Sequence, residues 1–172
     1  MATVRSTTIS QSIPRLFVLF TAAALLLPVG GACAQSTQPF DGLAGKWAGD
    51  GSIALTNGTT ERMRCDATYA VSGGGGDLDQ NLRCASDSYK FDLRIALSDK
   101  DGAILGNWNE VSKNVSGGIS GRDSRGLIQV TARGQTFTAA VTVATHGNEQ
   151  SVKIRAQSGD LSQVTITLRR QP

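Results

Sequence analysis

The sequence has few of the residues from which catalytic and metal sites are usually built. Its 172 residues include one histidine, His146, and three cysteines. A lone histidine gives no zinc-binding pattern, and no motif around His146 indicates a Ser-His-Asp triad. No glycine-rich phosphate motif precedes a helix, and the aspartates stand at turns or outward positions rather than as a catalytic pair. We therefore predict that the protein is not an enzyme and holds neither a metal nor a cofactor.

Long runs of charge or of apolar residues are also missing after residue 34. Only 18% of the residues are charged, and the longest basic run there is Arg169-Arg170. This pattern argues against nucleic acid as a partner. No apolar stretch of this part reaches the roughly 20 residues that a membrane-spanning helix needs. We expect no transmembrane segment in the mature chain.

The first 34 residues have the pattern of a secretory signal peptide. Arg5 and Arg15 are their only charged side chains, a short apolar run covers 16–29, and small residues lead to Ala34. A basic start, a short apolar core and an A-x-A ending are typical of a cleaved leader. We predict cleavage after Ala34 and a periplasmic or secreted location. Attachment of a lipid at Cys33 is the alternative.

Cleavage would also change the charge balance. Without Arg5 and Arg15, 15 of the 17 basic residues remain against 14 acidic ones, a net charge of +1. The basic isoelectric point of the full chain, about 9.0, is therefore no sign of nucleic-acid binding.

The remaining residues alternate between short apolar-patterned runs and turns. From Tyr89 to Leu97 every odd position is apolar or aromatic, while Lys90, Asp92 and Arg94 lie between them. Period-two alternation predicts a strand with one buried face. The same reading along the chain predicts about ten strands, over residues 46–56, 59–71, 77–86, 89–97, 103–111, 115–122, 127–133, 136–145, 149–157 and 161–170.

Each predicted strand is joined to the next by a short turn. Asn57-Gly58 is a strong two-residue hairpin signal, because both positions of such a turn must accept positive φ. A meander of about ten twisted strands with one apolar face closes most easily into a barrel. We therefore predict an all-β fold, a single antiparallel up-and-down barrel over residues 43–172 that follows a flexible segment, 35–42. A β-sandwich is the alternative, but it usually needs longer crossing connections.

Two cysteines remain after the leader, Cys65 and Cys84. Their midpoint falls between Gly74 and Gly75, inside a run of four glycines. If that run is a hairpin tip, the cysteines face each other across adjacent strands at a separation that a disulfide tolerates. An exported chain favours this bond, and we read it as structural. Two unpaired buried thiols are the alternative.

The first predicted strand opens with Gly45-Lys46-Trp47. A G-x-W at this place resembles the start of lipocalin-like (calycin) barrels. The resemblance implies that Trp47 packs at the closed end under a basic side chain of the last strand. Arg170 has the parity of the inward residues of that strand, so it is expected over Trp47 as a cation–π partner, while Arg169 points to water.

Two further resemblances concern function. The whole mature chain resembles a group of small exported proteobacterial proteins of unknown function, through motifs that include Leu82-Arg83-Cys84 and Gly106-x-Trp108. It is also similar to periplasmic inhibitors of secreted metalloproteases, which are small barrels with one disulfide. That second resemblance implies a protease partner and an inserting N-terminus at Gln35, Ser36 and Thr37. Those inhibitors have eight strands, against about ten here.

Our preferred interpretation is a barrel that binds a small apolar or amphipathic ligand. Eight strands are just filled by side chains, and about ten strands enclose more space. The predicted apolar lining consists of Met63, Tyr69, Phe91, Ile95, Trp108 and Phe137. Small residues at inward positions should leave room, namely Gly49, Gly51, Ala67, Gly106, Gly117, Gly121, Ala132, Ala139 and Ala156. A flattened barrel that binds nothing, a structural protein of the envelope, is the alternative.

Overall fold

The computed structural model describes residues 38–124 and 126–172. The predicted signal peptide, the lipidation alternative at Cys33 and the inserting residues 35–37 lie outside these ranges. No helix long and apolar enough to cross a membrane is found within the described part of the chain.

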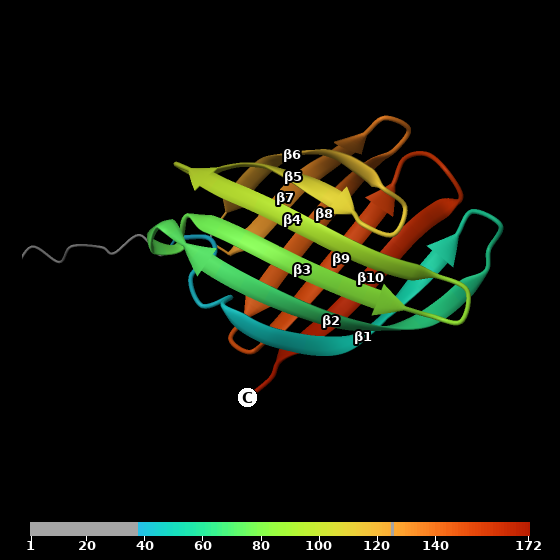
Figure 1. Ribbon diagram of the computed structural model, residues 1–172, viewed down its shortest axis with the longest axis horizontal. Helices are drawn as coiled ribbons and strands as arrows, with labels where there is room; N and C mark the ends of the chain where they lie inside the picture. Colours follow the sequence, from blue (N-terminus) through green and yellow to red (C-terminus); the bar gives the residue numbers. More distant parts are fainter. Residues whose placement is uncertain (1–37, 125) are drawn as a thin grey trace, which may run out of the picture. The chain divides into compact units, whose positions relative to one another are not determined.

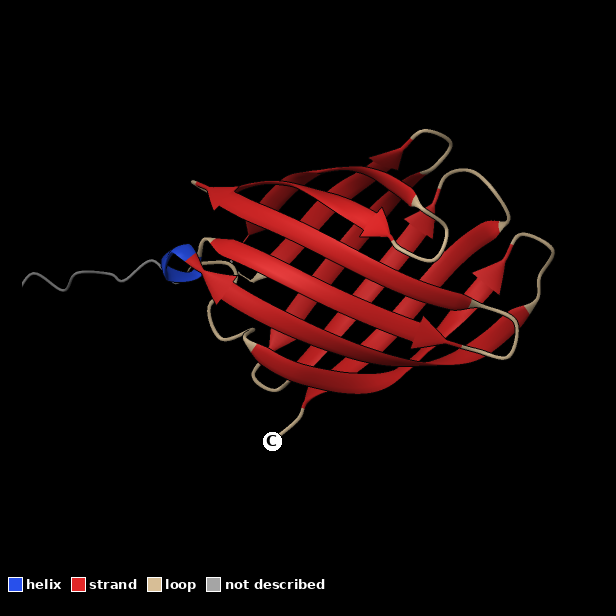
Figure 2. Ribbon diagram, viewed as in Figure 1, coloured by secondary structure: helices blue, strands red, loops and turns tan. Residues whose placement is uncertain are grey.

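The described residues form an antiparallel barrel of ten strands joined in chain order by short connections (Figure 1). The strands are β1 (Gly45–Leu55), β2 (Thr60–Ser72), β3 (Asp77–Ala85), β4 (Lys90–Lys100), β5 (Ala103–Glu110), β6 (Val115–Ser124), β7 (Leu127–Gly134), β8 (Thr138–His146), β9 (Glu149–Ala156) and β10 (Leu161–Arg170). One short 3₁₀ turn, η1 (Gly73–Gly75), joins β2 to β3 and is the helical element drawn in Figure 2.

The barrel is closed by pairing between the first and last strands. β1 runs antiparallel to β10 from the Trp47–Arg170 pair to the Leu55–Leu161 pair, with one irregularity at Ala54. Every strand therefore has two hydrogen-bonded neighbours, and the circle contains no free edge. The predicted barrel is confirmed, and the β-sandwich alternative is wrong.

Side-chain alternation follows the predicted parity. On β2, every second residue from Met63 to Tyr69 is buried, and the residues between them are exposed. Hydrophobic burial along one face of each strand supplies the main driving force for closing the sheet. The core is fullest at the Trp47 end, where Phe40, Leu43 and Leu168 are also almost completely buried.

The predicted disulfide is confirmed. Cys65 and Cys84 are directly paired across β2 and β3, and their sulfurs are bonded. Their Cα atoms lie 4.1 Å apart. The hairpin turns at η1, where the glycine run predicted it. Closing a loop of about 20 residues contributes roughly 3 kcal/mol in the chain-entropy model.

The Asn57-Gly58 turn differs in detail from its prediction. Gly58 has φ of +88°, but Asn57 is not among the residues with positive φ. Instead, the Asn57 side-chain oxygen accepts a hydrogen bond from the Thr59 backbone amide at 2.9 Å. The connection spans four residues between the strands, so only one left-handed position is needed.

Only the end of the predicted flexible segment, 35–42, is described. There Phe40 is fully buried, and its backbone amide donates to the Gly75 carbonyl at 3.3 Å. The alternating pattern of the strands gives no signal for this contact, because Phe40 precedes the first strand.

Candidate functional site

The barrel encloses a cavity of about 660 Å³. Its lining reaches the connections at one end, those that follow β3, β5, β7 and β9, so we call this end the mouth. Inward residues such as Leu93, Ile95 and Val143 remain partly accessible because they face this space rather than other side chains. The walls of the barrel are therefore separated by this space, and the alternative of a structural envelope protein without a ligand stays a prediction.

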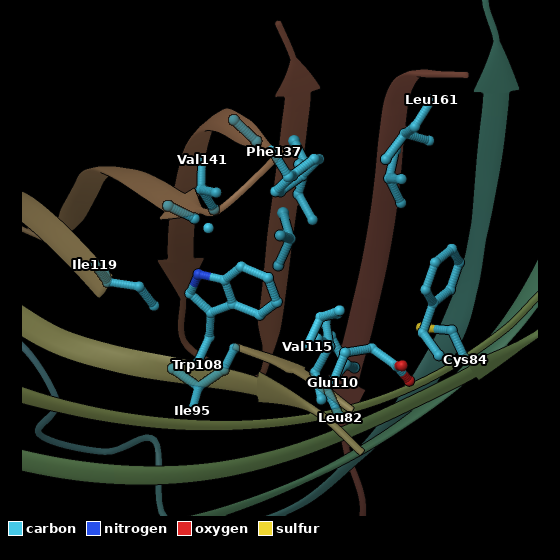
Figure 3. A pocket seen from close by; sticks show the side chains of 18 of the residues that line it. Leu82, Cys84, Ile95, Trp108, Glu110, Val115, Ile119, Phe137, Val141 and Leu161 are labelled. Carbon is cyan, nitrogen blue, oxygen red and sulfur yellow. The ribbon is translucent and has the colours of Figure 1, made fainter. Parts of the chain in front are cut away.

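All six residues predicted to line the barrel do line the cavity: Met63, Tyr69, Phe91, Ile95, Trp108 and Phe137. Trp108 and Phe137 project into the same space in Figure 3 and meet edge to face, with ring centroids 6.0 Å apart. Cys84 of the disulfide also lies on the wall. These contacts make the middle of the cavity strongly apolar, although a binding role for the six residues stays a prediction.

The small inward residues have a different role from the one predicted. Of the nine, only Ala132 and Ala139 line the cavity. The glycines lie where neighbouring backbones crowd the inner face: a Cβ at Gly49 would stand 1.9 Å from the Thr167 carbonyl oxygen. At Gly106 it would stand 2.0 Å from the Ala96 carbonyl oxygen. These glycines permit close backbone approach, and they do not create the cavity volume.

Trp47 seals the end opposite the mouth. The Arg170 guanidinium lies 4.6 Å from the centre of the Trp47 ring and also donates to the Gly42 and Ala44 carbonyls. The Trp47 indole donates to the Leu43 carbonyl at 2.8 Å. The Arg169 side chain, by contrast, is 74% exposed and pairs with Glu149. This is the arrangement that the lipocalin-like resemblance implied.

A cluster of neutral polar side chains forms the floor of the cavity next to this seal. Tyr69 contacts Trp47 edge to face and donates its hydroxyl proton to the Gln150 side-chain oxygen at 2.5 Å. Gln80 donates to the Tyr69 hydroxyl at 3.1 Å, and Gln150 donates to Thr145. Burial raises the pKa of Tyr69 far above its ordinary value, despite the opposing effect of its two glutamine partners, so this phenol stays neutral.

The mouth is organised by a buried carboxylate. Glu110, 4% exposed, accepts hydrogen bonds from the backbone amides of Asp92, Ser112 and Lys113 and from the Ser112 hydroxyl. Burial opposes ionisation, but the Ser112 hydroxyl and these amides outweigh it and lower the pKa of Glu110. The carboxylate thus shapes the connection between β5 and β6.

The same connection places a cation at the mouth. The Lys113 ammonium lies 5.4 Å from the centre of the Phe91 ring, and Lys113 is the one basic residue of the cavity lining among the described residues. Glu110 and Asp160 are the acids of that lining. The Glu110 carboxylate accepts the Lys113 backbone amide, but it forms no ion pair with the Lys113 ammonium among the described residues.

The sequence interpretation missed Gln80, Glu110, Lys113 and Gln150. For three of them a signal exists, because each breaks an inward apolar series: Leu78-x-Gln80-x-Leu82, Trp108-x-Glu110 and Gln150-x-Val152. A polar residue at an inward position is costly unless it is paired, so it marks a network or a site. Lys113 carries no such signal because it lies in a turn.

No group of histidine, cysteine, aspartate or glutamate side chains that could hold a metal occurs within residues 38–124 and 126–172. His146 ends β8 as an exposed residue, paired with Glu149 in the ladder.

No family model and no curated protein matches this chain. Solved structures do match. The Mycobacterium tuberculosis protein Rv2717c superposes with a TM-score of 0.58 at 15% identity, over 78% of this chain and 94% of that one. The S-type phycobiliprotein lyase of Guillardia theta superposes with a TM-score of 0.53 at 11% identity, over 75% and 88%.

The chain has a lipocalin-like barrel fold. Identities this low show the fold alone and carry no activity from one protein to another. The resemblance to small exported proteobacterial proteins stays a prediction.

Proposed function

We propose that this protein binds a small amphipathic ligand inside its barrel and performs no chemistry on it. One observation carries the proposal, namely the apolar cavity of about 660 Å³ with a polar mouth. Ligand sites of small molecules are typically concave, mostly apolar and roughly 300–1,000 Å³ in volume. A molecule that covered Trp108, Phe137 and the aliphatic walls would gain about 25 cal/mol for each Å² of apolar surface removed from water.

The ends of the cavity favour an amphipathic ligand over a purely apolar one. Lys113 stands at the mouth with its ammonium next to Phe91, where it can attract an anionic group that remains in contact with water. The apolar body of the ligand would then lie along the inner walls of β4, β5, β8 and β9.

An exported location accords with the disulfide. Structural disulfides persist in oxidising compartments such as the periplasm and are rare in the cytosol. The Cys65–Cys84 bond therefore supports a location outside the cytoplasm for the proposed binding protein.

The first test is native mass spectrometry of the protein purified from a periplasmic extract, followed by titration of the delipidated protein with dodecanoate. We expect an adduct of small mass in the first experiment and saturable quenching of tryptophan fluorescence in the second, because Trp108 lines the cavity.

A matched pair of variants on β8 makes the titration specific for the cavity. Val141 lines the cavity, whereas its neighbour Ala140 is exposed on the outer face. Val141→Trp should fill the cavity and weaken binding at least tenfold, while Ala140→Trp should leave it unchanged. Equal binding by both variants, or no binding by the folded wild type, would exclude the proposal.

The inhibitor hypothesis depends on residues 35–37, outside the described part of the chain, and stays a prediction. Deletion of those residues would abolish inhibition of a secreted metalloprotease if that hypothesis holds, and it would leave dodecanoate binding intact.

A further inference from the structure

The polar floor of the cavity interrupts an otherwise apolar interior. Tyr69 from β2, Gln80 from β3 and Gln150 from β9 all line the cavity at the end away from the mouth. Tyr69 and Gln150 bond across strands that are not neighbours, so this cluster spans the interior.

The apolar packing of the barrel interior does not require polar side chains at these positions. Leu78, Gln80 and Leu82 occupy consecutive inward positions of β3, and a leucine at position 80 would continue the apolar series. Neutral polar groups lose hydration when they are buried, and the cost is offset only where each finds a partner. A polar residue at such an inward position therefore needs hydrogen-bond partners inside the barrel.

One hydrogen-bond acceptor of this cluster, the side-chain oxygen of Gln80, is available to a ligand. The Tyr69 hydroxyl uses its proton for Gln150 and accepts one bond from the Gln80 amide nitrogen. The Gln80 side-chain oxygen has no hydrogen-bond partner in the part of the chain that the structure describes, and Gln80 is only partly buried. Because Tyr69 can give its proton to only one acceptor, the amide nitrogen of Gln80 must face Tyr69, which leaves the oxygen for a donor from elsewhere.

We propose that Gln80, positioned by Tyr69, is a recognition site for a neutral hydrogen-bond donor, a hydroxyl or an amide N–H, at the leading end of the ligand. This proposal rests on the proposed function and specifies the ligand class. The ligand is an amphiphile with polar groups at both ends, an anionic group next to Lys113 and a neutral donor on the floor. The floor contains no charged side chain among its four members, so it does not favour a second charge there.

The test compares two probes that differ only at the leading end, dodecanoate and ω-hydroxydodecanoate. In a purely apolar cavity the terminal hydroxyl would lose its water without replacement, and binding would weaken by roughly tenfold or more. We expect ω-hydroxydodecanoate to bind the wild-type protein at least as tightly as dodecanoate. Calorimetric titration of the full mature chain measures both affinities.

Two variants assign the effect to Gln80. Gln80→Leu should reverse the preference, so that dodecanoate binds roughly tenfold or more tightly than its hydroxylated partner. Gln135→Leu, the same change at an exposed residue of the cavity rim, should retain the wild-type preference. Thermal unfolding of both variants establishes that they are folded before binding is compared.

The outcomes separate this inference from the function on which it rests. If dodecanoate binds and the hydroxyl weakens binding tenfold in wild type and Gln80→Leu alike, the floor recognises nothing and only this inference fails. If both variants change the preference equally, Gln80 is not the recognition site. If neither probe binds folded wild-type protein at any concentration tested, the proposed function fails as well.

Discussion

Arg170 should contribute far more to stability than its neighbour Arg169, although the two are adjacent and carry the same charge. The Arg170 guanidinium covers the Trp47 ring and binds the Gly42 and Ala44 carbonyls, which ties the N-terminal connection to the last strand. Arg169 makes one exposed ion pair with Glu149. Substituting each arginine in turn therefore compares the stability contributions of an inward and an outward position on the same strand.

The expected magnitudes follow from these contacts. A cation–π contact contributes about 0.5–2 kcal/mol, and hydrogen bonds from a charged group contribute about 1.5–3 kcal/mol each when well buried. Since Arg170 is partly exposed, we expect Arg170→Ala to lower the free energy of unfolding by about 2–4 kcal/mol. Arg169→Ala should cost no more than about 1 kcal/mol, the usual upper value for a surface ion pair.

Urea unfolding followed by tryptophan fluorescence measures both variants, because Trp47 reports directly on the contact. Arg170→Lys should fall between wild type and Arg170→Ala, since an ammonium cannot reproduce the two-pronged geometry of the guanidinium. None of the three substitutions removes a backbone group from the pairing of β1 with β10, so each variant should still fold. A loss in Arg169→Ala equal to or larger than that in Arg170→Ala would refute the assigned role.

Two further predictions concern the walls and the mouth. Gly117→Ala should destabilise the protein by about 1–3 kcal/mol and alter Trp108 emission, because its Cβ would lie 1.8 Å from the Arg133 carbonyl oxygen and 2.8 Å from the indole nitrogen. Gly118→Ala, whose Cβ would meet its nearest neighbour at 4.0 Å, should change stability by less than about 0.5 kcal/mol, and similar losses in both would contradict the crowding argument. Burial raises and the loop hydrogen bonds lower the pKa of Glu110, with a net lowering, so its stabilising effect is present above the ordinary carboxyl pKa and is lost as the pH falls through the lowered value. The free energy of unfolding should therefore fall less steeply on acidification in Glu110→Gln than in wild type, and parallel curves would show that Glu110 does not couple to folding.

The strand order and the wall of the barrel could be predicted from local patterns. The period-two alternation of apolar residues placed all ten strands within about three residues of their observed bounds. This was possible because the alternation within each strand indicates which of its own residues face the interior. The cysteines flank the glycine turn symmetrically, so their pairing followed from hairpin geometry alone. The contact between Arg170 and Trp47 was predicted from the inward position of Arg170 on the last strand together with the resemblance to lipocalin-like barrels.

The cavity and its polar ends were decided only by the tertiary structure. The inward glycines relieve contacts with neighbouring backbones, a role that depends on how sharply the closed sheet bends. Tyr69 and Gln150 stand 81 residues apart on strands that are not neighbours, and they meet only because ten strands close around a common interior. Alternation tells which side of the wall a residue faces, but closure and strand tilt decide what lies opposite it. For that reason the sequence alone determined a disulfide-bonded barrel of ten strands, and the three-dimensional arrangement determined the cavity inside it.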